Sequence, residues 1–134
     1  PLGRGFLTGA IRQRSDLDQS DWRLANPRFS EENFHHNLKL VETVQAMANE
    51  LGCSSAQLAL AWMLAQSPHI VPIPGTRNLD RLGENAAAAE IELGSELLVK
   101  LDEVIASASI YGERYPEGGM ALLMGDTPER VSNG

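Results

Sequence analysis

The stretch Ile70-Val-Pro-Ile-Pro-Gly-Thr-Arg-Asn-Leu-Asp-Arg-Leu-Gly-Glu-Asn85 decides the interpretation of the whole chain. Its apolar start, residues 70–73, predicts a short strand that suits burial on both faces of a parallel sheet. Pro74 and Gly75 predict a turn, and helical spacing resumes at Asn78. A strand, a glycine turn and a helix start in this order are typical of an anion site. The first N–H groups of a helix lack internal partners, and the helix dipole favours negative charge there.

Polar side chains follow the turn at positions that could contact such an anion. Arg77 lies in the turn and Arg81 in the first helical turn, where a guanidinium group can bind a phosphate through two parallel hydrogen bonds. Glu84 and Asn85 share a helix face with Arg81, so these three side chains could contact a phosphate and a purine edge together. A plain strand-to-helix connection with solvated charges has the same spacing, and from spacing alone it is the commoner outcome.

The length and composition indicate one globular domain or a part of one. The chain has 134 residues, of which 43% are hydrophobic, as is ordinary for a folded domain. Its formal net charge of −7 argues against nonspecific binding to nucleic acid. No apolar run approaches the roughly 18 residues of a membrane-spanning helix, and no signal peptide is evident. The lone Cys53 cannot form an internal disulfide, which fits a reducing, cytoplasmic location.

Three patterns that could indicate another fold or a metal site fail on inspection. The glycine-rich segment 3–9 resembles a dinucleotide fingerprint, but its spacing is one residue too long and no strand precedes it, which excludes a doubly wound fold. The Asp-x-Asp-x-Ser pattern at 16–20 resembles a calcium loop, but Asp21 stands where that loop needs glycine. His35 and His36 point in different directions on a helix, so they cannot share a metal ion. We therefore predict no metal site.

Helical patterns occupy most of the remaining chain. Ser30 caps a helix with an apolar stripe of period 3.6, and Gly52 ends this helix. Residues 54–57 form a capping box, and the helix that follows, roughly 55–66, is apolar on nearly all sides and should be buried. Ser95 is predicted to cap the last clear helix. The helix after the glycine turn should bury a stripe made of Leu79, Leu82, Ala86 and Ala89.

These pieces together resemble the aldo-keto reductases. Ile73-Pro-Gly-Thr76 followed by Arg81-Leu-Gly-Glu-Asn85 is close to the carboxyl-terminal signature of that family. The other pieces fall in the family's order and span nearly the whole chain. They are Pro1-Leu-Gly-Arg-Gly-Phe-Leu-Thr-Gly9 at the exit from barrel strand seven, Asp21-Trp-Arg23 and Pro27-Arg-Phe29 in the following loop, Ala56-Gln-Leu-Ala-Leu-Ala-Trp62 in helix seven, and Gly112-Glu-Arg-Tyr115 in the tail.

The resemblance implies an α/β fold, namely the carboxyl-terminal part of a (β/α)8 barrel, mostly helical here with one or two short parallel strands. Residues 1–134 would form one portion of a single barrel domain. Its divisions would be the loop after strand seven (1–30), the helix seven region (31–67), strand eight (70–74), helix eight with the carboxyl-terminal helix (78–108) and a tail (109–134). Two of eight barrel units cannot close a sheet. We therefore expect packing against the remainder of the barrel or against another copy.

The resemblance also implies bound NADPH. Carried over by position, Leu2, Gly3 and Arg4 would border the pyrophosphate, and Glu84 and Asn85 would meet the adenine. The adenosine 2′-phosphate would be held by Gly75, Thr76, Arg77 and Arg81. Many family members have Lys where this chain has Gly75, so the two arginines must supply the charge. NADPH is therefore the expected cofactor, and NADH is the less favoured one.

The family's chemistry uses an Asp, a Tyr, a Lys and a His, and the Tyr donates a proton as hydride moves from the nicotinamide to a carbonyl. Tyr111, Tyr115, Lys39 and Lys100 match none of these catalytic motifs. We therefore expect a parent enzyme that reduces aldehydes or ketones, in which this chain supplies the adenosine-phosphate half of the cofactor site. The chain alone would have no catalytic residue and be inactive. The alternative is a non-catalytic barrel module that senses nucleotides or binds a partner protein.

The sequence does not identify the carbonyl substrate. Trp22, Phe29 and the apolar cluster 120–124 could line or cover its pocket, since loops of this kind shape the pocket in the family. Ordinary packing explains each of them equally well.

Overall fold

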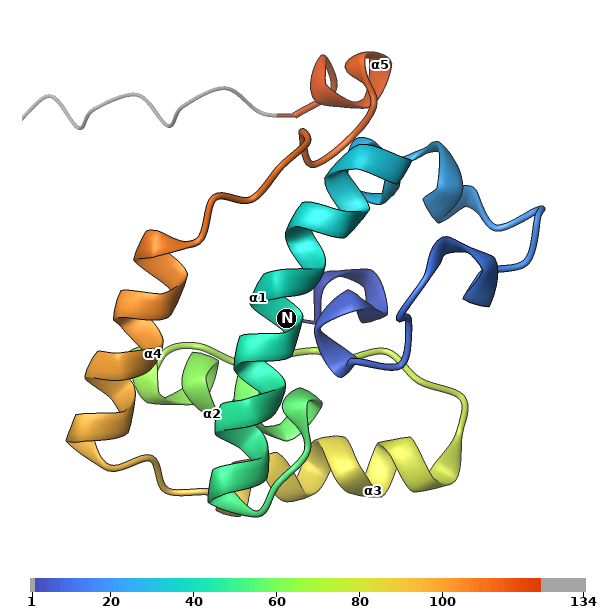
Figure 1. The fold of residues 1–134 in the computed structure, drawn as a ribbon. Helices are drawn as coiled ribbons and strands as arrows, with labels where there is room; N and C mark the ends of the chain where they lie inside the picture. Colours follow the sequence, from blue (N-terminus) through green and yellow to red (C-terminus); the bar gives the residue numbers. More distant parts are fainter. Residues whose placement is uncertain (1, 124–134) are drawn as a thin grey trace, which may run out of the picture.

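The computed structural model describes residues 2–123, which fold as helices and 3₁₀ turns joined by irregular segments (Figure 1). No strand forms among these residues. The α-helices are α1 (Glu31–Leu51), α2 (Ser55–Gln66), α3 (Leu79–Ala87), α4 (Ser95–Ser107) and the short α5 (Glu117–Met120). The 3₁₀ turns are η1 (Gly3–Thr8), η2 (Arg14–Asp16), η3 (Trp22–Ala25), η4 (Pro27–Phe29) and η5 (Ala88–Glu90). None of the helices described is long and apolar enough to cross a membrane.

Helices α1 and α2 begin and end where the sequence predicts. The Ser30 hydroxyl accepts a hydrogen bond from the Asn33 N–H at the start of α1, and Gly52 ends the helix with a φ of 76°. Ser54 and Gln57 bond each other's backbone N–H at the start of α2, which confirms the predicted capping box. These signals are local, so they specify the helix ends without help from distant residues.

The core consists of two apolar clusters that meet along α1, the long helix in the middle of Figure 1. At the amino-terminal end of α1, the rings of Phe6, Phe29 and Phe34 pack together, and the Phe6 centroid lies 4.9 Å from that of Phe34 and 5.4 Å from that of Phe29. Further along, Val44 of α1 packs with Leu58 of α2 and other residues in the second cluster. Helix α1 therefore holds the amino-terminal turns and the later helices in one body.

The predicted strand at 70–74 is not formed. The segment between α2 and α3 has no regular structure, and the predicted burial on both faces is wrong, because Val71 is 79% exposed and Ile73 is 84% exposed. A strand is stabilised by ladder hydrogen bonds to its neighbours, and no other strand is present among residues 2–123. The described part of the chain is therefore helical, in agreement with the expectation of a mostly helical fragment.

Helix α3 begins at the predicted place but turns a different face inward. The Asn78 side chain accepts a hydrogen bond from the Arg81 N–H (2.9 Å) and caps the helix. The predicted apolar stripe is nevertheless not buried, since Leu79 is 83% exposed and Leu82 is 56% exposed. The half-buried positions are Glu84 and its neighbour Asn85. Helical periodicity identifies the apolar face correctly, but what covers that face depends on other segments.

Helix α4 packs against α1 and α2, although its predicted cap is wrong. Gly94 is the residue before the first turn, and Ser95 is the first helical residue without a capping bond. Leu101 is buried in the second cluster. The Trp62 Nε1–H of α2 donates to the Asp102 carboxylate of α4 (2.8 Å), which fixes the register of the two helices.

Candidate functional site

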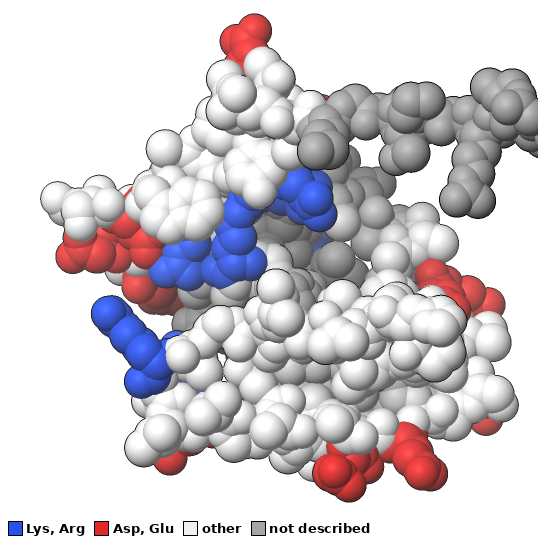
Figure 2. All heavy atoms as spheres, turned by 180° about the vertical axis from the view of Figure 1, so that it is seen from behind, with Lys and Arg blue, Asp and Glu red and all other residues white. Residues whose placement is uncertain are grey.

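A cavity of about 900 Å³ lies between the amino-terminal segment, the residues before α3, and α3 itself. Its lining includes eight of the nine residues predicted to bind the cofactor, which are Leu2, Gly3, Arg4, Gly75, Thr76, Arg81, Glu84 and Asn85. Figure 2 shows basic side chains along the rim of a recess on this face of the molecule. Residues that are more than 70 positions apart in the sequence are thereby brought to one hollow.

Arg77 is the exception among the predicted residues. It is exposed and does not line the cavity, whereas Arg81 does. The Thr76 hydroxyl accepts a hydrogen bond from the Asn78 N–H (3.1 Å), which shapes the turn between these two arginines. The structure therefore brings one guanidinium group of the predicted pair to the cavity and leaves the other outside it.

The start of α3 has the polarity that an anion site requires, with one counteracting charge. The Arg81 N–H donates a hydrogen bond to the Asn78 side chain. The N–H groups of Leu79 and Asp80 make no hydrogen bond within residues 2–123. Such first-turn N–H groups can bind an anion. The Asp80 side chain is acidic and also lies in this turn. Arg81 is therefore the residue that must offset Asp80 for an anion to bind here.

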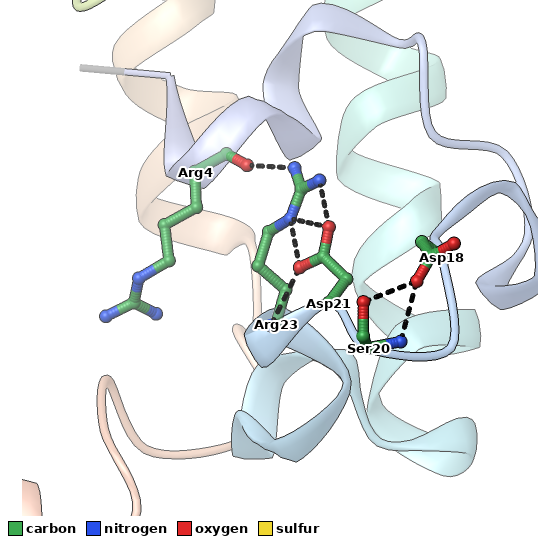
Figure 3. Close-up of polar contacts among 5 residues, drawn as sticks. All are labelled: Arg4, Asp18, Ser20, Asp21 and Arg23. Carbon is green, nitrogen blue, oxygen red and sulfur yellow. Dashed lines mark hydrogen bonds and ion pairs between the residues drawn. The ribbon is translucent and has the colours of Figure 1, made fainter.

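The amino-terminal segment contains an unusual run of left-handed residues. Gly3, Arg4 and Gly5 have φ values of 57°, 60° and 89°. This conformation is easy for glycine but strained for Arg4. The Arg23 Nη1 donates to the Arg4 carbonyl (2.9 Å) and holds it in place (Figure 3). A Cβ added at Gly5 would lie 3.3 Å from Arg23 Nη1, so glycine there allows this close support.

Arg23 is itself neutralised by Asp21. The Asp21 carboxylate accepts from Arg23 Nε (2.9 Å) and Nη2 (2.6 Å), as Figure 3 shows. These hydrogen bonds lower the pKa of Asp21 from 3.8 to about 2, and they raise the pKa of Arg23. Arg23 therefore acts as a support for the backbone at Arg4, and its charge is already matched by a carboxylate.

The Arg4 side chain lies between two aromatic rings. Its guanidinium carbon is 5.3 Å from the centroid of Trp22 and 4.7 Å from that of Tyr115. A cation over an aromatic face is attracted by the ring quadrupole. Trp22, predicted to cover a pocket, therefore packs on a cavity-lining arginine without lining the cavity itself. Phe29 lines the cavity and also belongs to the core.

The segment after α4 is fastened to η4 and α1 by two buried amides. The Asn26 side chain is 2% exposed and donates to the Arg114 carbonyl (3.1 Å). The Asn37 side chain is 7% exposed and bonds both backbone groups of Tyr111. Gly112 approaches Pro27 so closely that an added Cβ would lie 2.7 Å from the Pro27 carbonyl. These contacts hold the 110–115 segment beside the cavity.

Sequence analysis missed two arginines that this docking adds to the site. Arg28 and Arg114 both line the cavity. The Arg28 Nε donates to the Gly112 carbonyl (3.2 Å), and its pKa is lowered by burial and then by the positive charges of Arg114 and Arg4. The motifs that contain them are separate in the sequence, and only the fold shows that both arginines line one cavity.

No tyrosine is hydrogen-bonded to a lysine in the described part of the chain. Tyr115 lines the cavity, whereas Tyr111 stacks on His36 at 4.4 Å between centroids. Lys100 pairs with Glu96 (3.0 Å) on the surface of α4, and Lys39 is exposed on α1. No group of three or more His, Cys, Asp or Glu residues among 2–123 could hold a metal ion.

The predicted cluster 120–124 is described only up to Leu123. Leu122 and Leu123 are exposed, Met120 is half-buried, and none of the three lines the cavity. Met124 lies outside the described residues, as does Pro1 of the amino-terminal motif.

Comparison with known proteins agrees with the resemblance. The family model described as "Aldo/keto reductase family" matches residues 1–106. The chain is 41% identical over 128 residues to the aldo-keto reductase yakc of Schizosaccharomyces pombe, whose name carries NADP(+), and the match covers 96% of this chain and 38% of that protein. It is 36% identical over 129 residues to the aldo-keto reductase str7 of Strobilurus tenacellus, with the same two coverages, 96% and 38%. The chain thus spans well under half the length of these relatives.

Proposed function

Because this chain belongs to the aldo/keto reductase family, we propose that it forms the NADPH-binding portion of an oxidoreductase that reduces aldehyde or ketone carbonyls. The observation that carries this proposal is the single cavity lined by both ends of the predicted cofactor motif, from Leu2 to Asn85. Its volume of about 900 Å³ is of the order that binding sites for extended ligands have. When bound, NADPH supplies the hydride, and the residues of this chain bind and orient the cofactor.

The proposed roles divide the cavity into three parts. Leu2, Gly3 and Arg4 border the pyrophosphate. The left-handed backbone at Gly3 and Arg4 supports this role because it lets main-chain groups approach a ligand closely. Glu84 and Asn85 meet the adenine. The adenosine 2′-phosphate is held by Gly75, Thr76, Arg77 and Arg81.

Preference for NADPH over NADH depends mainly on Arg81 in this proposal. Many family members have Lys at the place of Gly75, and Arg77 does not line the cavity. Arg81 is therefore the one cation from the predicted pair that faces the hollow. The NADP(+) in the name of the yeast relative is consistent with this preference.

The proposal also covers where the catalytic groups lie and what this chain packs against. Tyr111, Tyr115, Lys39 and Lys100 match no catalytic motif of the family, so we propose that the described residues bind the cofactor and that proton transfer to the carbonyl uses groups elsewhere in the barrel. The exposed apolar residues Val71 and Ile73 would pack against the remainder of the barrel or another copy. A cytoplasmic location is also part of the proposal and rests on the unpaired Cys53.

The test is a fluorescence titration of the chain with NADPH and with NADH. We expect tighter binding of NADPH. Arg81→Ala should weaken NADPH binding about tenfold, because a guanidinium–phosphate pair is charge-assisted, and should change NADH binding little. Arg77→Ala makes the same change of charge and should have the smaller effect. Binding of neither nucleotide by a folded chain, or equal loss of both nucleotides in Arg81→Ala, would overturn the assignment.

The alternative function, a non-catalytic module that senses nucleotides or binds a partner protein, predicts the same cofactor binding without turnover. The two are separated by following NADPH oxidation by the whole barrel protein with an aldehyde. Oxidation that requires the aldehyde supports the reductase, and binding without oxidation supports the module.

A further inference from the structure

The cavity holds more positive charge than the proposed cofactor roles use. Arg28 of η4 and Arg114 of the 110–115 segment line it together with Arg4. We propose that Arg28 and Arg114 form a second anion subsite beside Arg4, which takes a carboxylate or phosphate group of the carbonyl substrate. This inference deepens the proposed function and rests on it for the identity of the substrate, but the binding of an anion by this pair can be tested independently.

Not all of the arginines that line the cavity are paired with a carboxylate. Arg23, which also lines the cavity, is paired with Asp21. Neither Arg28 nor Arg114 takes part in an ion pair within residues 2–123. Burial and the positive charges of Arg114 and Arg4 lower the pKa of Arg28, and the opposing effect of the Glu113 carboxylate is smaller. An anion between the guanidinium groups would relieve this mutual repulsion.

Arg28 is already oriented by hydrogen bonds to its backbone and its Nε. Its N–H donates to the Asn26 side chain (3.2 Å), and its carbonyl accepts from the Asn37 side chain (3.1 Å). Its Nε donates to the Gly112 carbonyl (3.2 Å). With the backbone and Nε fixed, only the two terminal nitrogens lack a hydrogen bond within the described residues. A preoriented guanidinium loses less entropy when it binds an anion.

Arg114 reaches the cavity on a backbone that is held independently of its side chain. Asn26 binds the Arg114 carbonyl, and Asn37 holds Tyr111 three residues earlier. The apolar side chains of Phe6, Phe29 and Ile110 line the same cavity. Apolar walls reduce the screening of charges by water at Arg28, which is half-buried, whereas Arg114 is exposed. We therefore expect Arg28 to make the stronger of the two contacts with the anion.

The positions of Arg28 and Arg114 in the chain favour the substrate as the source of the anion. The proposed cofactor phosphates are met by residues 2–4 and by the turn before α3. Arg28 lies in η4 and Arg114 lies beyond α4, so neither belongs to those segments. A carbonyl compound with a carboxylate or phosphate group would use the charges that the cofactor leaves unmatched. The pair therefore predicts an anionic substrate.

The test follows the Arg28 Nε–Hε resonance of the ¹⁵N-labelled chain during titration with inorganic phosphate at constant ionic strength. We expect saturable shifts, with binding weakened about fivefold or more by Arg114→Gln, since a charge-assisted contact is lost. This substitution keeps the backbone carbonyl that Asn26 binds. Lys39→Gln makes the same change of net charge at an exposed position on α1 and should have little effect. Equal loss in both variants would overturn the proposal.

Two further arms separate the sources of the anion. Pyruvate should shift the Arg28 resonance, whereas its uncharged methyl ester should not, and equal shifts with both would overturn the carboxylate role. With NADPH at saturation, the phosphate shifts should persist. Their loss would assign the pair to the cofactor and overturn the proposal. If NADPH does not bind while phosphate still binds through Arg28 and Arg114, the proposed cofactor function fails and the anion subsite stands.

Discussion

Asn37 and Tyr111 are joined by two hydrogen bonds that tie the segment after α4 to α1. The Asn37 side-chain amide donates to the Tyr111 carbonyl (2.9 Å) and accepts from the Tyr111 N–H (2.8 Å). The amide is buried and thus replaces the strand or helix partners that this segment lacks. Because the same segment brings Arg114 and Tyr115 to the cavity, one asparagine links the stability of the fold to the composition of the site.

Replacing this asparagine should therefore loosen the segment. We expect Asn37→Ala to lower the free energy of unfolding by about 1–3 kcal/mol, since it leaves buried backbone groups without partners. Urea unfolding measures the loss, and amide exchange at Tyr111 should become faster. Asn49→Ala, at an exposed position on the same helix, is the matched control and should change neither. Unchanged exchange at Tyr111 in Asn37→Ala would contradict this account.

Gly112 makes the closest backbone approach in the docked segment. Its φ is 88°, and an added Cβ would lie 2.7 Å from the Pro27 carbon and oxygen. Gly112→Ala should therefore displace the segment and lower the free energy of unfolding by about 1–3 kcal/mol, through strain and lost packing. Gly118→Ala is the control, because an added Cβ there meets nothing within 4 Å. Equal stability of the two variants in thermal unfolding would show that the contact with Pro27 is not needed.

Features that depend on neighbouring residues could be predicted from the sequence, and features that depend on distant ones could not. The Ser30 cap and the capping box at Ser54 form within one turn, so the ends of α1 and α2 were predicted correctly. The amphipathic pattern of α3 was identified, but its apolar face is exposed in the described chain. The strand at 70–74 requires neighbouring strands. Local sequence patterns thus predict where helices begin and end better than they predict which helix faces are buried.

In the candidate site, too, local features could be predicted from the sequence and features set by distant residues could not. The cofactor motif was predicted as two separate stretches, and the fold brings most of it to one cavity. Arg28 and Arg114 were missed because their place in one cavity depends on Asn26, whose amide binds a carbonyl 88 residues further along the chain. Arg77 was predicted beside Arg81, but side-chain direction in an irregular turn follows no periodicity. Which distant side chains line one cavity is decided by tertiary packing, which a single sequence does not record.

The Asp21–Arg23 pair predicts a specific loss of stability in acid. The pKa of Asp21 is lowered from 3.8 to about 2 by the hydrogen bonds from Arg23. Since the folded-state pKa is the lower one, ionised Asp21 stabilises the fold above about pH 4, and this stabilisation is lost as the pH falls toward 2. The melting temperature of Asp21→Asn should therefore fall less steeply between pH 5 and pH 2, as rough limits, than that of the unsubstituted chain.

A control for the acid experiment is available on α1. Glu42 is exposed and makes no ion pair within residues 2–123, so Glu42→Gln should keep the pH dependence of the unsubstituted chain. If Asp21→Asn and the unsubstituted chain lose stability in parallel, the pair does not contribute to acid sensitivity. Because Asp21 also accepts the Arg23 N–H, Asp21→Asn should be somewhat less stable at neutral pH.

The exposed apolar residues before and on α3 predict association of the isolated chain. Ile73, Leu79 and Leu82 are all large, hydrophobic and exposed, and apolar surfaces of this kind favour contact with another polypeptide. Sedimentation equilibrium should show a concentration-dependent increase in mass, which Ile73→Lys combined with Leu79→Lys should reduce. Val99 and Ile105 on α4 are also exposed, so Val99→Lys combined with Ile105→Lys provides a control with the same change of charge. Equal reduction by both pairs would show that the association does not depend specifically on the surface formed by Ile73, Leu79 and Leu82.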